Sequence, residues 1–158
     1  MRRKLIAGNW KLHKGPAEGA ALARAIVEGA GAPGSTEAGG VAAVDLVVCP
    51  PFVTLPAVAA IIRDGRVRLG AQDVYWEAQG AFTGEISAPM LAEVGCQCVI
   101  IGHSERRHVF GESDEEVARK LLAAQAAGLT PIVCVGEQLG EREAGRTWEV
   151  VSRQIVAA

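Results

Sequence analysis

The amino-acid sequence predicts an α/β fold built on one parallel β-sheet, in a single domain that takes in residues 1–158. Three observations support this prediction. Short apolar runs recur at average intervals of roughly 31 residues, the length of one strand–helix unit. Each run is almost continuously apolar, as in strands that are covered on both faces. Helix-like segments separate the runs, and this alternation is typical of either an open doubly wound sheet or part of a barrel.

Five strands are expected, one in each apolar run. The runs are KLIAGNW at residues 4–10, VDLVVCPP at 44–51, RVRLGAQ at 66–72, CQCVIIGH at 96–103 and TPIVCVGE at 130–137. Because consecutive parallel strands need a crossover between them, each pair should be joined by a helix.

Helices are expected in five segments that carry start and stop signals: residues 16–29, 56–62, 87–94, 113–128 and 147–158. The clearest begins at Ser113, because Glu116 three residues later completes a capping box and Gly128 can end the helix. In the last segment, Trp148, Val151 and Ile155 share one side. Residues 29–40 are rich in glycine and alanine with no apolar face, which indicates a mobile surface connection.

The composition limits the classes of partner. The 158 residues are 49% hydrophobic and carry a formal net charge of -2 at pH 7, so no charge excess would attract nucleic acid or a membrane surface. The apolar stretch near the start is too short for a secretory segment, and we expect a cytoplasmic protein. The four cysteines lie mostly in apolar runs, which favours reduced core thiols over disulfides or a metal site. We expect no metal and no cofactor.

Polar side chains follow the predicted strands where each strand ends. They are Asn9 and Lys11, Gln72 and Asp73, His103, Ser104 and Glu105, and Glu137. Because ligands bind at the carboxyl ends of parallel strands in both candidate folds, these residues should gather on one rim.

Lys11 suggests anion binding at this rim. An ammonium at the end of a buried strand is costly to desolvate unless an anion compensates it, although a solvated lysine that merely ends the strand is about equally plausible. Asn9 could donate to a substrate oxygen or cap a turn.

His103 directly precedes a polar segment that should begin a helical turn. Backbone N–H groups of that turn can hydrogen-bond to the imidazole and disfavour a second proton, which leaves a neutral ring able to stabilise charge on a carbonyl oxygen. A packing histidine is the alternative, and on its own the more common case. Glu105 could act as a base, but the neighbouring cations favour an ion pair with a lowered pKa.

Five motifs in order resemble the triosephosphate isomerase family. They are AGNWKLHK at 7–14, CPPFVTL at 49–55, GAQDVYWEAQGAFTGEIS at 70–87, VIIGHSERR at 99–107 and PIVCVGEQLGEREAGRT at 131–147. The resemblance implies the (βα)8 barrel and so favours a barrel over an open sheet. It also implies interconversion of dihydroxyacetone phosphate and glyceraldehyde 3-phosphate, by proton transfer through an enediol(ate), with a small phosphorylated triose as the partner.

The resemblance assigns roles to the rim. By this resemblance Lys11 and His103 would be the catalytic residues, Asn9 and Lys11 would bind substrate, and Glu105 and Ser104 would support them. A histidine kept neutral by a helix N-terminus is an established feature of that family. Loop 73–87 resembles the segment that inserts into a second subunit, so we expect a homodimer. The interface residues implied in this way are Gln72, Phe82, Thr83, Gly84 and Glu85.

Five units are present where the family's barrel has eight. The resemblance places the proton-abstracting glutamate after the sixth strand, beyond these residues, so the isolated 158-residue chain should be an inactive, incomplete barrel of about five strands. Open edges on the first and fifth strands could instead make it a self-associating, non-catalytic assembly module, or let it relax to an open parallel sheet.

Overall fold

The computed structural model describes residues 4–30, 44–63 and 65–158. The strands are β1 (Lys4–Asn9), β2 (Val44–Cys49), β3 (Val67–Ala71), β4 (Cys98–Ile101) and β5 (Thr130–Val133). The helices are α1 (Pro16–Ala30), η2 (Phe52–Thr54), α2 (Leu55–Ile62), α3 (Ala88–Val94), α4 (Ser104–Val109), α5 (Asp114–Ala126), α6 (Leu139–Glu143) and α7 (Thr147–Ala157).

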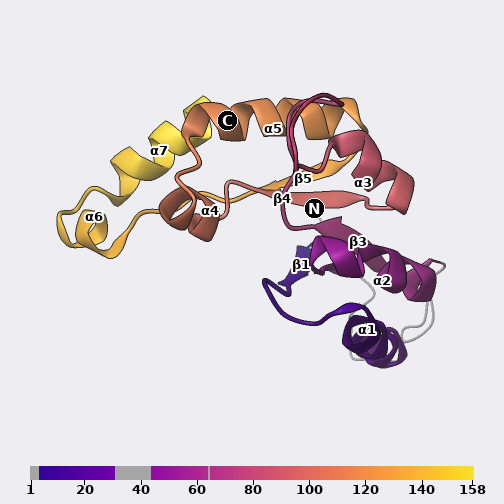
Figure 1. The fold of residues 1–158 in the computed structure, drawn as a ribbon. Coiled ribbons are helices and arrows are strands. Elements are labelled where there is room, and N and C mark those ends of the chain that lie inside the picture. Colours follow the sequence, from indigo (N-terminus) through magenta and orange to yellow (C-terminus); the bar gives the residue numbers. More distant parts are fainter. Residues whose placement is uncertain (1–3, 31–43, 64) are drawn as a thin grey trace.

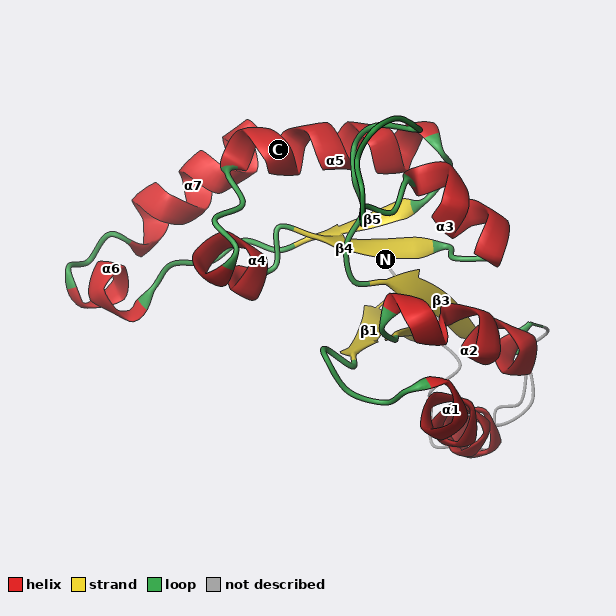
Figure 2. Ribbon diagram, viewed as in Figure 1, coloured by secondary structure: helices red, strands yellow, loops and turns green. Residues whose placement is uncertain are grey.

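The five strands form one parallel sheet in the order β1-β2-β3-β4-β5, as the sequence predicts. The sheet curls into half of a barrel and does not relax into a flat, open sheet (Figure 1). Helices α1 and α2 lie side by side against its first half, and α3, α5 and α7 lie on the side of its second half (Figure 2). No helix in these described ranges is long and apolar enough to cross a membrane.

The concave face of the sheet holds a small core of its own. Val47, Cys49, Cys98 and Ile100 are buried there together. Gly70 lies on β3, between the strands that carry Cys49 and Cys98. A Cβ atom at this position would be 2.6 Å from Cys49 Sγ. The pKa of Cys49 is raised to about 12, mainly because the thiol is buried and to a smaller extent because other thiols lie near it. Cys49, Cys96 and Cys98 are buried core residues and Cys134 is half-buried, and all four thiols are free.

The larger core fills the space between the convex face and the helices. Its members include Leu55, Val58, Leu69, Leu91 and Val117, all at least 97% buried. Branched side chains from strands and helices pack together here, and their removal from water stabilises the fold.

The expected helices form with small differences at their ends. Ser113 and Glu116 make the complete capping box. Helix α1 continues to Ala30, one residue beyond the expected stop at Gly29. Short helix α6 was not expected. The surface connection expected at 29–40 falls almost entirely outside the described residues.

Helix α7 buries a different side from the one its apolar residues suggest. Trp148 is 80% exposed and Ile155 is 58% exposed, whereas Val150 and Gln154 are buried. The Gln154 side chain accepts a hydrogen bond from Gly136 N–H at 2.7 Å and donates to Gly136 C=O at 3.2 Å. With Gln154 facing inward, Trp148 and Ile155 point outward and Val151 is half-buried.

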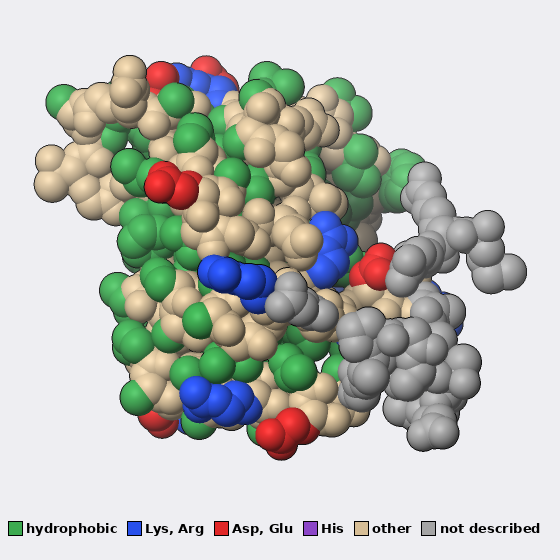
Figure 3. Space-filling view, turned by 90° about the vertical axis from the view of Figure 1, so that its right-hand side faces the viewer, with side chains coloured by type: hydrophobic (Ala, Val, Ile, Leu, Met, Phe, Trp, Pro, Cys, Tyr) green, Lys and Arg blue, Asp and Glu red, His purple; other side chains and the backbone are tan. Residues whose placement is uncertain are grey.

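The two edges of the sheet are β1 and β5, as expected for five units. Strand β1 is exposed along most of its length, and Ile6 on it is 60% exposed. The face on the side of the strands' N-terminal ends is seen in Figure 3, where apolar and charged side chains are interspersed. The polar rim lies at the opposite end.

Candidate active site

One cavity of about 670 Å³ lies at the carboxyl ends of the strands. Asn9, Lys11, Gln72, His103 and Glu105 all line it, so the structure brings together the rim residues that the sequence singles out. Ser104 and Glu137 instead line a neighbouring cavity of about 280 Å³, between α4 and the segment after β5.

The backbone at Lys11 is held in an unusual conformation. Its φ is +50°, in the left-handed region that non-glycine residues rarely adopt. The Asn9 side-chain oxygen accepts a hydrogen bond from Lys11 N–H at 2.9 Å. Gln72 donates to Lys11 C=O at 2.9 Å and to Cys49 C=O at 2.8 Å. A backbone conformation of this kind persists only where the surroundings fix it. Here the hydrogen bonds with Asn9 and Gln72 hold it, and the side chain of Lys11 extends across the cavity mouth.

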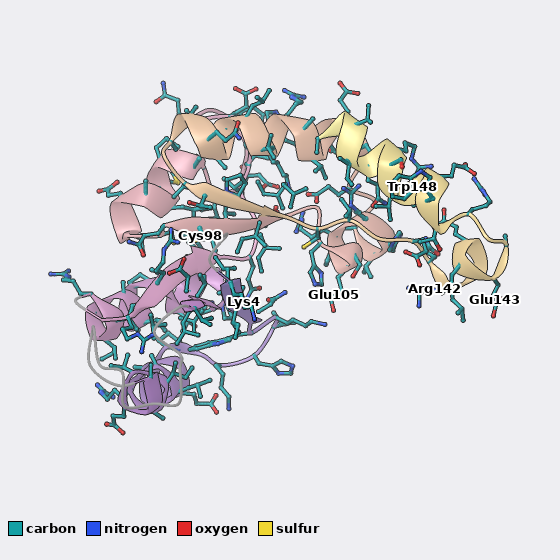
Figure 4. The ribbon with its side chains drawn as sticks, turned by 180° about the vertical axis from the view of Figure 1, so that it is seen from behind. Lys4, Cys98, Glu105, Arg142, Glu143 and Trp148 are labelled. Atoms are coloured by element: carbon teal, nitrogen blue, oxygen red, sulfur yellow. The ribbon has the colours of Figure 1, made fainter. Side chains whose placement is uncertain are left out.

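Lys11 and Glu105 form an ion pair across the rim. Lys11 Nζ lies 2.7 Å from Glu105 Oε1, and both side chains are about half exposed. Glu105 projects from α4 toward the segment that follows β1 (Figure 4). The hydrogen bond from Lys11 holds the pKa of Glu105 below its usual range, as expected for an ion-pair partner and not for a base. Exposed pairs of this kind add little stability.

His103 is the N-cap of α4. Its Nδ1 accepts a hydrogen bond from Glu105 N–H at 3.2 Å. Glu105 Oε2 is also 3.5 Å from Nδ1. Because Nδ1 accepts the capping bond, it carries no proton in this geometry, and the ring N–H is the one at Nε2.

Arg107 fixes the peptide that precedes His103, a role that the sequence does not announce. Its Nε donates to Gly102 C=O at 2.8 Å, and its Nη1 lies 2.5 Å from Asp114 Oδ1. Gly102 has φ +67°, and a Cβ there would lie 2.9 Å from Arg107 Nη2 and 3.0 Å from Val117 Cγ2. We call these contacts of Arg107 with Gly102 and Asp114 the Arg107 clamp. Its only signal in the sequence is a predicted strand that ends in glycine and is followed by a segment with two arginines.

Loop 73–87 is organised around two aromatic rings. The centroids of Tyr75 and Phe82 are 4.8 Å apart, and Tyr75 forms an isolated bridge with Ser87. Phe82 is 40% exposed, and Thr83, Gly84 and Glu85 are exposed beside it. Gln72, which the resemblance places at the interface, makes its observed hydrogen bonds within the chain.

A second set of charged residues reaches from the rim into the interior. Asp73, Arg106, Glu112 and Lys120 contact one another; Asp73 lines the main cavity, as the sequence predicts, and so does Arg106, whereas Glu112 and Lys120 are almost fully buried. The sequence does not reveal the set as a whole, because Glu112 and Lys120 look like ordinary surface residues of a helix and its approach. Among the described residues, no group of three or more histidine, cysteine or acidic side chains could hold a metal ion.

A curled parallel sheet with a cation and an imidazole around one cavity at its carboxyl ends defines a chain of the (βα)8-barrel type. The family model for triosephosphate isomerase matches residues 4–158, and the chain belongs to this family.

Related proteins match nearly the whole chain. It is 54% identical to the triosephosphate isomerase of Chloroflexus aurantiacus, over all of this chain and 60% of that protein. It is 50% identical to the Moorella thermoacetica enzyme, over 98% of this chain and 59% of that protein. The crystal structure of the Bartonella henselae triosephosphate isomerase superposes with a TM-score of 0.88 at 38% identity, covering 99% of this chain and 61% of that one. The chain thus spans about 60% of the length of these relatives.

Proposed function

We propose that the protein to which these residues belong interconverts dihydroxyacetone phosphate and glyceraldehyde 3-phosphate in the cytoplasm. The observation that carries the proposal is the placement of Lys11 and His103 around one cavity, in a chain 54% identical to a triosephosphate isomerase. A small, doubly charged phosphorylated triose is the kind of substrate that an ammonium at a cavity mouth attracts.

The reaction moves a proton between two adjacent carbons, and negative charge develops on the carbonyl oxygen as the first proton leaves. Nε2–H of a neutral His103 can donate to that oxygen and stabilise the enediolate. Lys11 supplies positive charge, and Asn9, whose oxygen is used by Lys11 N–H, offers its amide N–H groups to the substrate. Glu105 is a poor base because Lys11 holds its pKa down.

The base is therefore proposed to lie outside these 158 residues, where the family resemblance places a glutamate after the sixth strand. General-base help is commonly worth about 10² to 10⁴ in rate. A polypeptide of residues 1–158 alone should consequently show no turnover of glyceraldehyde 3-phosphate in a coupled spectrophotometric assay, with its mass verified. Turnover close to that of a complete enzyme would refute this part of the proposal.

The function itself is tested in the complete protein by His103→Gln. The glutamine amide can still donate, but it cannot place its N–H where the ring does, so kcat should fall at least a hundredfold. His108→Gln is the matched control, since His108 lies on the same helix but outside the main cavity. If the unaltered protein shows no isomerisation, or if both variants keep full activity, the proposed function fails.

We also propose a homodimer in which loop 73–87 of one subunit enters the cavity of the other. The cavity wall includes the exposed apolar residues Leu12, Phe52, Val109 and Phe110. Glu85 at the loop has the charge opposite to Lys11 and Arg106 of the cavity. Glu85→Arg should shift the protein toward monomer in sedimentation, whereas Glu93→Arg, exposed on α3, should not. An unchanged dimer in both variants would contradict the proposed docking mode.

A non-catalytic assembly module is the second candidate for the 158-residue polypeptide itself. The exposed edge strand β1 and the exposed apolar residues Ile6 and Trp148 favour it, because unpaired edges and apolar surface promote association. The side chain of Trp148 projects from α7 at the surface (Figure 4). A monodisperse monomer in sedimentation would count against this candidate.

A further inference from the structure

The four charged residues that reach from the rim into the interior form a closed ring of ion pairs. Lys120 Nζ lies 2.8 Å from Asp73 Oδ1 and pairs closely with Glu112. Arg106 Nε lies 2.9 Å from Asp73 Oδ2 and 3.1 Å from Glu112 Oε1. Two cations and two carboxylates alternate around the ring, so its formal charge is zero. We call Asp73, Arg106, Glu112 and Lys120 the ion ring.

The ion ring is a poor device for stability alone. The side chains of Lys120 and Glu112 are each 3% exposed, so both ions lose most of their hydration. Ion pairs this deeply buried are often no more stabilising than apolar residues of the same volume. Glu112 Oε2 also lies buried without a hydrogen-bond partner in the described part of the chain. Burial raises the pKa of Asp73, and Lys120 and Arg106 oppose this shift.

The position of the ion ring links the two groups that hold Lys11. Asp73 directly follows Gln72, which donates to the Lys11 carbonyl. Arg106 directly follows Glu105. The carboxylate of Glu105 accepts a hydrogen bond from Lys11 Nζ, and the backbone N–H of Glu105 donates one to His103 Nδ1. Lys120 joins both sides from α5, and it does not line the cavity itself.

We propose that the ion ring is a positioning device for the candidate active site, with Lys120 as its key residue. By tying the end of β3 to α4 through α5, it sets the separation of Lys11 and His103. This inference rests on the proposed function for its kinetic consequence. A misplacement of about 1 Å, caused by a mutation remote from the reacting atoms, can cost a hundredfold in rate.

The test uses the complete protein with three variants of the ion ring and one control. Lys120→Met keeps the volume and removes the charge, and it should lower kcat by about ten- to a hundredfold. Lys120→Arg keeps the charge and should retain most of the activity. In Lys120→Met/Glu112→Gln the charges balance again, so thermal stability should recover while kcat stays low. Val58→Ala, in the core at α2, controls for destabilisation.

A purely structural role predicts a different pattern. The proposal is overturned if kcat recovers together with stability in the double variant, or if Lys120→Met loses no more activity than Val58→Ala at an equal loss of melting temperature.

A second readout separates this proposal from the proposed function. The ¹⁵N spectrum of the His103 ring reports whether Nδ1 remains the unprotonated, capping nitrogen. Lys120→Met should shift the ring toward a mixture of tautomers, and this measurement needs no isomerase activity. If the unaltered protein is inactive but the ring shifts, the proposed function fails and the positioning role stands. An unchanged ring spectrum in Lys120→Met overturns the positioning role.

Discussion

Replacement of Gly102 by alanine is the sharpest test of how the rim is built. Gly102 has φ +67°, and a left-handed conformation costs a residue with a side chain about 1 kcal/mol. The new Cβ would also lie 2.9 Å from Arg107 Nη2, so the guanidinium must move and weaken its bond to Gly102 C=O. A buried hydrogen bond from a charged group is worth about 2 kcal/mol. The sum is a loss of about 3 kcal/mol in the free energy of unfolding.

Gly111→Ala is the matched control. Gly111 has φ +75°, and no atom lies within 4 Å of the place where its Cβ would be. The Gly111→Ala variant should lose only the conformational contribution, about 1 kcal/mol in the free energy of unfolding. For a chain of this size, 1 kcal/mol lowers the melting temperature by about 2–4 °C. Thermal denaturation followed by circular dichroism should therefore show a drop of roughly 6–12 °C for Gly102→Ala and 2–4 °C for Gly111→Ala. Equal drops in the two variants would refute the Arg107 clamp.

Three other expectations concern single groups. Because Lys11 lowers the pKa of Glu105 in the folded protein, Glu105 should stay ionised to lower pH than in the unfolded chain. The contribution of the Lys11–Glu105 pair to folding stability should therefore be lost as the pH falls through the folded pKa. A ¹³C titration of the Glu105 carboxyl group checks this, and a normal pKa would contradict it. Ser113→Ala removes the capping box and should cost about 1 kcal/mol in thermal or urea denaturation, whereas no loss would mean that the cap is dispensable. With a pKa of about 12, Cys49 should not react with a disulfide reagent at pH 8 until the protein unfolds; labelling at the rate of an exposed thiol would show that this core opens.

Features that depend on nearby residues could be predicted from the sequence. The capping box at Ser113 and the five strands follow from patterns a few residues long, and the structure confirms them. The meeting of Lys11 and His103 was also predictable, because parallel strands bring their carboxyl ends to one edge. The roles of these two residues in a reaction remain predictions.

Features that depend on contacts between distant segments could not be predicted. Lys120 lies 47 positions from Asp73, and nothing near either residue signals that they pair. Gln154 gives a similar lesson in α7. The apolar residues of α7 suggest the wrong buried side, whereas the side chain that faces inward is Gln154, which makes two hydrogen bonds to Gly136. The polar partner of a helix has to be known before its orientation can be assigned.

Gly70 restricts which residues of this sheet can be replaced in protein engineering. The thiol of Cys49 and a methyl group of Val47 already occupy the space that any larger residue would need. A saturation library at this position should yield almost only glycine among folded clones. Libraries aimed at the candidate site should therefore diversify the segments that follow the strands and leave Gly70 unchanged.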